Sequence, residues 1–152
     1  MDSYDWRLLA ALQQNGRLTN QEVGTVIGLS ASQVSRRRTH LEGTGVIKGY
    51  AARLDSKAVG FDVLAFIHVN LRAHDAKSLR LFQQLVSTDA AIQEAHSVSG
   101  DADYLLKVVA ASLEELSTFV TNTLLVNDTI AHVKSYIVLK QMKQTIELPT
   151  RP

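Results

Sequence analysis

Residues 19–41 read TNQEVGTVIGLSASQVSRRRTHL, and the order of polar, apolar and glycine residues in them specifies the architecture of the N-terminal part of the chain. Thr19 and Glu22 have the spacing of a capping box, and so do Ser30 and Gln33, so a helix is predicted to begin at each pair. Two short helices joined by a glycine-containing turn, with the second helix basic, are typical of a helix-turn-helix. The stretch therefore predicts a DNA-binding element.

The second helix of this pair has a basic outer face. At about 100° per residue, Val34 and Leu41 lie on the side that faces inward. Residues near the N-terminal end of such a helix reach base edges, and the guanidinium of Arg36 can bind O6 and N7 of guanine. Arg37 lies on the flank, where it suits a phosphate. The candidate base readers are Ser32, Gln33, Ser35 and Arg36. The full set of candidate DNA-binding residues is Ser30, Ser32, Gln33, Ser35, Arg36, Arg37, Arg38, Thr39 and His40.

Three consecutive arginines, residues 36–38, also fit the solvated face of an ordinary surface helix. The predicted bracing helix and the turn before them favour a recognition helix instead. Residues 1–54 carry seven Lys or Arg and four acids, whereas the rest of the chain carries nine and eleven. The excess positive charge therefore lies in the N-terminal part, where a polyanion is expected to bind.

The neighbouring residues complete a small domain. An earlier helix has its leucines on one side and ends at Asn15–Gly16. Residues 46–54 predict a short strand or hairpin. We therefore expect a helix-turn-helix domain over residues 1–50 and a linker over residues 51–60.

After residue 60 the hydrophobic period changes to that of strands, beginning with the alternation from Phe61 to Leu71. The later elements predicted are a helix capped by Asp75, strands over residues 92–98 and 104–110, a helix capped by Ser112, and a strand over residues 130–139. The order βαββαβ predicts an α+β, ferredoxin-like module with both helices on one face of an antiparallel sheet. It is expected over residues 61–140, with a polar tail over residues 141–152.

The other face of that sheet has no helix to cover it. Leu64 and Phe66 belong to this face, and both are poor residues to expose to water. We expect them in a self-association interface, so the protein is predicted to be at least a dimer.

Composition excludes several classes of function. Of 152 residues, 45% are apolar and 20% charged, as in soluble globular proteins. Without cysteine there is no disulfide, thiol catalysis or cysteine-based zinc site. The first residues do not resemble a secretory signal, and apolar runs such as Val63–Ile67 are too short to span a bilayer. We expect a cytoplasmic protein with no membrane partner.

Two blocks of motifs resemble a known family over nearly the whole chain. The first block reads DxxLL from Asp5, NGR from Asn15 and LSxSxVxxRxxxLExxGVIxGY from Leu29, and the second reads GDxDYLL from Gly100 and SYIVLK from Ser135. Together they resemble the Lrp/AsnC regulators, named for leucine response and asparagine synthesis.

This resemblance implies a transcriptional regulator of amino-acid metabolism. A winged helix-turn-helix over residues 1–50 would be joined by a hinge strand or linker over residues 51–60 to a ligand-sensing domain. Similar proteins bind double-stranded DNA and form dimers through the sensing domain, and the dimers assemble further into octamers. Their effector, an amino acid or related metabolite, binds between dimers. The segment near that site matches Gly100, Asp101, Asp103 and Tyr104 here. No cofactor or metal is expected.

The same segment has a chemical interpretation. Asp101 or Asp103 can accept hydrogen bonds from the ammonium of an amino acid, and turn amides near Gly100 can donate to its carboxylate. A plain hairpin turn is the alternative, because Gly and Asp are common turn residues.

Arg38 departs from the family pattern, which has an apolar residue at this position. It lies only about 40° from Val34 on the helical wheel. A buried guanidinium without a partner is costly, so we expect Arg38 to reach solvent or to pair with a carboxylate.

Two other functions stay open on the sequence alone. An enzyme would use Asp101 with Asp103, or His68, His96 and His132 as metal ligands, but these histidines lack HxH or HExxH spacing. We therefore expect no catalysis. An architectural DNA-binding protein without an effector is the second alternative, and a ligand-dependent change in DNA binding separates it from a regulator.

Overall fold

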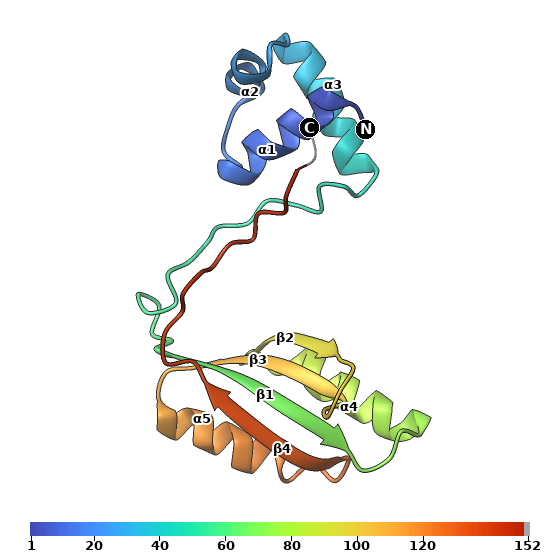
Figure 1. Cartoon of the computed structure of the whole chain (residues 1–152), viewed down its shortest axis with the longest axis vertical. Coiled ribbons are helices and arrows are strands. Elements are labelled where there is room, and N and C mark those ends of the chain that lie inside the picture. The colour runs from blue at the N-terminus through green and yellow to red at the C-terminus, as the bar shows by residue number, and fades with distance from the viewer. Residues whose placement is uncertain (151–152) are drawn as a thin grey trace. The chain divides into compact units, whose positions relative to one another are not determined.

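The computed structural model describes residues 1–150, which form two compact units (Figure 1). The N-terminal unit comprises Met1–Arg53 together with residues 143–150, and the sheet unit comprises Leu54–Met142. The C-terminal residues, expected only as a polar tail, thus lie with the N-terminal unit. No helix among the described residues is long and apolar enough to cross a membrane.

Three helices form the N-terminal unit. They are α1 (Ser3–Gln14), α2 (Asn20–Ile27) and α3 (Ala31–Gly43). The two predicted capping boxes are present at the starts of α2 and α3. Between these helices the chain passes so close to α2 that a Cβ on Gly24 would lie 2.4 Å from the Leu29 carbonyl oxygen, so the turn requires glycine there. The core between the helices contains Leu8, Val23, Ile27, Val34 and Leu41.

The strand or hairpin expected over residues 46–54 is absent, and residues 51–60, expected as a hinge strand or linker, contain no strand. These residues form turns and irregular backbone. Gly49, inside the first of these segments, has a φ of +156°, and a glycine weakens the interior of a β-strand. A strand needs a paired neighbour, and the sheet of the described residues consists of β1 to β4, none of which pairs with this segment.

The sheet unit has the predicted βαββαβ order. Its elements are β1 (Val63–Leu71), α4 (Ala76–Thr88), β2 (Ile92–Ser97), β3 (Tyr104–Ala110), α5 (Leu113–Phe119), a π-helical turn (Val120–Leu124) and β4 (Ile130–Ile137). The strands pair antiparallel in the order β2-β3-β1-β4, and α4 and α5 cover one face of the sheet (Figure 1). The predicted α+β architecture is therefore confirmed.

Buried and more exposed residues alternate along β1, and the two sets lie on opposite faces of the sheet. Ala65, Ile67 and Val69 are completely buried in the core that includes Phe82 of α4. β1 begins at Val63 rather than Phe61, because Val63 pairs with the last residue of β3 and Phe61 extends beyond it. The residues between those of the core belong to the opposite, helix-free face, called the open face below.

Candidate nucleic-acid interface and ligand loop

The outer side of α3 presents polar side chains to solvent. Its exposed residues are Ser32, Gln33, Ser35, Arg36, Thr39 and His40. Arg36 has neither an ion-pair partner nor a hydrogen-bond partner in residues 1–150. A ligand can therefore bind the guanidinium of Arg36 without displacing any partner of that side chain among the described residues.

Side chains at the N-terminal end of α3 cap the helix. The carboxamide oxygen of Gln33 accepts a hydrogen bond from the Ser30 amide at 2.9 Å, and the hydroxyl oxygens of Ser30 and Ser32 are 3.1 Å apart. These contacts fix Ser30, Ser32 and the carbonyl end of Gln33 in the capping arrangement. The Nε2 group of Gln33 has no hydrogen bond among the described residues, so it is still free to donate.

Arg37 is bound by two carboxylates at the start of α1. Its guanidinium lies 2.8 Å from Asp2 and 2.7 Å from Asp5, and it also lies over the ring of Tyr4. Hydrogen bonds from Arg37, first to Asp5 and then to Asp2, raise the pKa of its guanidinium. This side chain joins α3 to α1, and its charge is largely neutralised within the unit.

The guanidinium of Arg38 has hydrogen-bond partners, among them a carboxylate. Its Nε donates to the Tyr50 hydroxyl at 2.8 Å and to Glu42 at 3.3 Å. Its Nη1 donates to the Leu18 carbonyl at 3.2 Å and to Asn20 at 3.4 Å. The expected carboxylate is thus present, and one side chain joins α3 to the α1–α2 connection and to the segment after α3.

Tyr50 completes this cluster. Its hydroxyl donates to Glu42 at 2.9 Å, and its ring lies under the Arg38 guanidinium, 4.7 Å from Cζ. Burial, and then the hydrogen bond to Glu42, raise the pKa of the Tyr50 phenol. The ring also lies against Gly16, where a Cβ would come within 3.3 Å of it.

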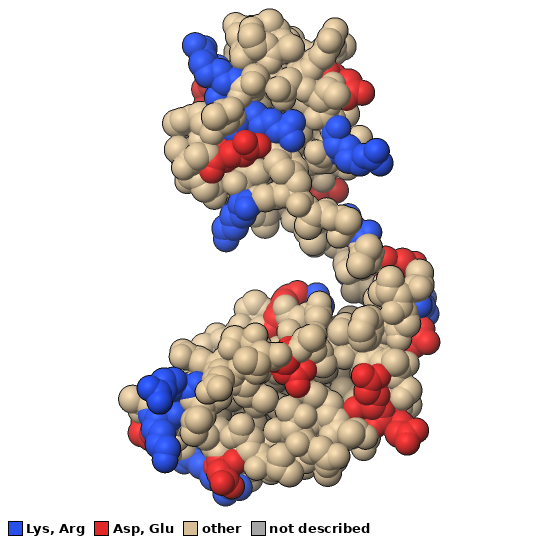
Figure 2. Space-filling model, turned by 180° about the vertical axis from the view of Figure 1, so that it is seen from behind, with Lys and Arg blue, Asp and Glu red and all other residues tan. Residues whose placement is uncertain are grey.

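The sequence did not reveal the partners of Arg37 and Arg38. Asp2 and Asp5 cap α1, which their spacing indicates, but their contacts with Arg37 span more than 30 residues of chain. On the face that Figure 2 shows, Lys and Arg groups of the N-terminal unit are interspersed with acidic ones. On this face the basic groups of the N-terminal unit therefore form no continuous patch.

Hydrogen bonds connect the loop between β2 and β3 to the end of β1. The carboxylate of Asp103 accepts from the Leu71 amide at 2.8 Å and lies 3.0 Å from the His74 ring. The Leu71 hydrogen bond is the main cause that lowers the pKa of Asp103. Asn70 donates to the Asp101 carbonyl at 2.9 Å. Both oxygens of Asp103 thus serve to position the loop.

The remaining candidate ligand residues differ in availability. Gly100 has a φ of +127°, which side-chain-bearing residues rarely adopt. Asp101 is exposed, and its carboxylate makes no hydrogen bond or ion pair among the described residues. Tyr104 points to the core, where its ring centroid is 4.5 Å from that of Phe82. Of the three side chains predicted for this site, only that of Asp101 is free.

The open face is partly apolar. Phe66 is 36% exposed and Tyr136, its partner across β1 and β4, is 42% exposed. Leu64 is half-buried on the same face, and His68 lies against Tyr136 with ring centroids 4.9 Å apart. At the β2 edge, Glu94 pairs with Lys107 at 2.6 Å and with His96 at 3.2 Å.

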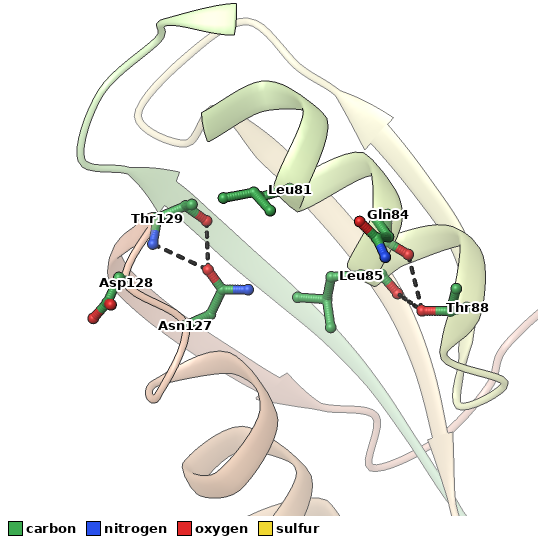
Figure 3. Close-up of a pocket in the computed structure, with 7 residues that line it drawn as sticks. All are labelled: Leu81, Gln84, Leu85, Thr88, Asn127, Asp128 and Thr129. Atoms are coloured by element: carbon green, nitrogen blue, oxygen red, sulfur yellow. Dashed lines mark hydrogen bonds between the residues drawn. The ribbon is translucent and has the colours of Figure 1, made fainter. Parts of the chain in front are cut away.

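A cavity of about 400 Å³ lies between α4 and the loop before β4 (Figure 3). Leu81 and Leu85 line one side of it. On the other side, Asn127 accepts hydrogen bonds from the amide and hydroxyl of Thr129, at 3.0 and 2.6 Å.

Among the described residues, no three His, Asp or Glu side chains are close enough together to hold a metal ion, so His68, His96 and His132 do not form the site considered for an enzyme.

Family models match both units. The AsnC-type helix-turn-helix domain matches residues 1–42, and the Lrp/AsnC ligand binding domain matches residues 64–148. The leucine-responsive regulatory protein of Rhizobium meliloti is 34% identical over 97% of this chain and 95% of its own length. The transcriptional regulator AzlB of Bacillus subtilis is 30% identical over 98% of this chain and 95% of its own length.

Solved structures agree with these matches. A transcriptional regulator of Neisseria meningitidis in complex with L-Met has a TM-score of 0.95 and 34% identity, covering 98% of this chain and 96% of that one. AsnC of E. coli has a TM-score of 0.90 and 25% identity, covering 98% of this chain and 99% of its own.

Proposed function

This chain belongs to the Lrp/AsnC family of transcriptional regulators, and we propose which of its residues bind DNA and which bind the effector. Members of this family have a DNA-binding helix-turn-helix and a ligand-binding domain and are not enzymes. α3 is the recognition helix, and Arg36 is its principal base-reading residue. The observation that carries this assignment is that Arg36 alone of the three consecutive arginines has no partner in residues 1–150. Arg37 and Arg38 hold α3 in position instead.

The other exposed residues of α3 complete the DNA contact. Ser35, Thr39 and His40 lie along the same exposed side and can donate to bases or phosphates, and Gln33 can do so through Nε2. Ser30 and Ser32 hold the end of α3 that enters the major groove. We also propose that the protein is cytoplasmic, because a transcriptional regulator has to reach double-stranded DNA.

Selection from a random duplex library tests the DNA assignment. The full chain is expected to enrich one motif, and Arg36→Ala is expected to enrich the same motif with one position degenerate. Recovery of the unchanged motif by Arg36→Ala would remove Arg36 from the set of base readers.

We propose further that the effector is an amino acid bound at the loop of Gly100 and Asp101. A relative with 34% identity was solved in complex with L-Met. The Asp101 carboxylate is free to accept hydrogen bonds from an ammonium group, and the backbone at Gly100 can approach a ligand closely. Asp103, whose oxygens are occupied, positions the loop, and Tyr104 anchors it to the core.

Self-association through the open face is the third part of the proposal. Leu64 and Phe66 lie on a face that none of the described helices covers, and a second copy would remove their apolar surface from water. As the family resemblance implies, such dimers then assemble into octamers. An architectural DNA-binding protein is the competing function, and it would show no change in DNA affinity with any amino acid.

A further inference from the structure

The end of β1 lies between two loops of the sheet unit. The loop between β2 and β3 and the segment before β4 reach the same end of the sheet as the end of β1 (Figure 1). On one side, the Leu71 amide donates to the Asp103 carboxylate at 2.8 Å. On the other side, the Arg72 amide donates to the Thr129 carbonyl at 2.8 Å. Hydrogen bonds on both sides therefore hold the backbone of Arg72 beside the candidate ligand loop.

Arg72 directly follows β1, and its side chain is exposed. The guanidinium makes no hydrogen bond or ion pair among residues 1–150. Leu71 is buried in the core of the sheet unit, and successive side chains of an extended chain point to opposite faces. Arg72 therefore projects from the open face, on the same side of the sheet as Asn70.

Asn70 brings the backbone of Asp101 close to this arginine. Its side-chain amide donates to the Asp101 carbonyl at 2.9 Å, and its Cα lies only about 7 Å along the chain from that of Arg72. The carboxylate of Asp101 and the guanidinium of Arg72 nevertheless form no ion pair with each other or with any described residue. One negative and one positive group thus lie near each other at this end of the sheet, and both are available to a ligand.

We propose that Arg72 binds the α-carboxylate of the effector while Asp101 binds its ammonium group. A free amino acid carries these two charges close together, and the planar guanidinium of arginine can donate two parallel hydrogen bonds to a carboxylate. The site therefore selects free amino acids over their α-amides, which lack the carboxylate. This inference rests on the proposed binding of an amino acid at the loop of Gly100 and Asp101.

Lys134 of β4 is another cation on the open face. Its ammonium lies over the ring of Tyr136, 5.3 Å from the centroid. The pKa of Lys134 is raised chiefly through Tyr136, and the charge of Asp101 is the last of the causes. Tyr136 pairs with Phe66, which is farther from the end of β1 than Asn70 is. Lys134 therefore already has a partner away from the loop, and it serves as the matched control for Arg72.

The test measures by calorimetry how the full chain binds matched ligands. The probes are the twenty L-amino acids and, for each that binds, its α-amide, which keeps the side chain and the ammonium. At about pH 6.5 the ammonium of both probes stays protonated. Arg72→Met removes the charge but keeps a long side chain, and Lys134→Met makes the same change at the control position. Asp101→Asn is paired with Asp128→Asn, which changes an exposed acid of the segment before β4.

The wild type is expected to bind the amino acid at least tenfold more tightly than its α-amide. Arg72→Met should lower the affinity for the amino acid about ten- to a hundredfold, the effect of lost hydrogen bonds between charged groups, and leave that for the amide unchanged. Asp101→Asn should weaken the binding of both probes, because both carry the ammonium. Lys134→Met and Asp128→Asn should bind both probes as the wild type does. Melting curves check folding, and Arg72→Gln replaces Arg72→Met if the latter does not fold.

The possible failures point to different causes. If the wild type binds no amino acid, or if Asp101→Asn binds like the wild type, the proposed effector site is wrong. If Asp101→Asn weakens binding but Arg72→Met does not, or if Arg72→Met weakens the amino acid and the amide equally, the role of Arg72 is wrong and the effector site stands. A loss confined to the amino acid in Lys134→Met would also overturn it, because Lys134 would then bind the carboxylate.

Discussion

At the scale of single residues, three neighbouring arginines have three different environments. Successive helical residues point about 100° apart, so Arg36 faces solvent, Arg37 faces the start of α1, and Arg38 faces the segment after α3. Their identical charge gives no indication of this difference. Whether an arginine is free for DNA depends on the acids that the fold brings to it.

Arg36→Ala is expected to lower the affinity for the selected motif by about 1–3 kcal/mol, because a bidentate contact to guanine is lost. Fluorescence anisotropy on matched and mismatched duplexes measures this loss. Arg80→Ala, which removes an exposed arginine of the sheet unit, is the control and should leave affinity unchanged. An equal loss on every duplex would instead assign Arg36 to phosphate binding.

Arg37→Met is expected to lower the melting temperature at pH 7, because Asp2 and Asp5 lose their partner. The pKa of Asp2 lies below its ordinary value of 3.8, first through the hydrogen bond from the Asp5 amide and then through Arg37. A lowered carboxyl pKa stabilises the fold at neutral pH, and this stabilisation is lost as the pH falls through the folded pKa. The difference from wild type should therefore shrink as the pH falls below 3.8 and through the lowered pKa of Asp2.

Melting curves of wild type and Arg37→Met between neutral and acid pH check this account. A difference in melting temperature that is the same at both ends of the range would show that packing, and not the ion pairs, is what the variant loses. A flatter salt dependence of DNA binding would show that Arg37 binds phosphate after all.

At the scale of elements, local signals predicted the helices and strands well. The capping residues Thr19, Ser30, Asp75 and Ser112 each accept from a backbone amide in the first turn of the helix that they precede. Alternation predicted β1 within two residues. The strand or hairpin predicted over residues 46–54 is wrong, since these residues form bends and irregular backbone and pair with no strand among the described residues.

Gly24→Ala is expected to destabilise the N-terminal unit, because the added Cβ would lie 2.4 Å from the Leu29 carbonyl oxygen and backbone would have to move. A cost of about 1–3 kcal/mol is typical of such overpacking. Gly43→Ala is the matched control: a Cβ there meets nothing within 4 Å, and alanine should be neutral or stabilising in the helix. Equal stability of the two variants would contradict the close approach of the turn to α2.

The candidate sites were predictable only in part. The sequence placed the exposed side of α3 and the loop at Gly100, because helical period and turn residues are local signals. It did not show that Asp103 binds Leu71 and His74, or that Tyr104 packs on Phe82. These contacts depend on how β1, β3 and α4 pack, and no short pattern specifies that.

At the scale of the whole molecule, self-association is expected to depend on the open face. Phe66→Asp would place a charge in the contact between copies and should yield monomers, because an unpaired buried carboxylate is costly. Sedimentation velocity at micromolar concentration measures this. Val26→Asp, on the exposed side of α2, is the control and should sediment like the wild type. A wild type that is monomeric would contradict the proposed interface.

We propose that an amino acid bound at the loop of Gly100 and Asp101 changes how α3 binds DNA. The most direct test measures the affinity of the full chain for its selected duplex with each of the twenty amino acids, for wild type and Asp101→Asn. We predict that at least one amino acid changes the affinity of the wild type, and that Asp101→Asn needs about ten- to a hundredfold more of it for the same change. Equal responses of the two proteins, or no response of the wild type to any amino acid, would contradict the claim.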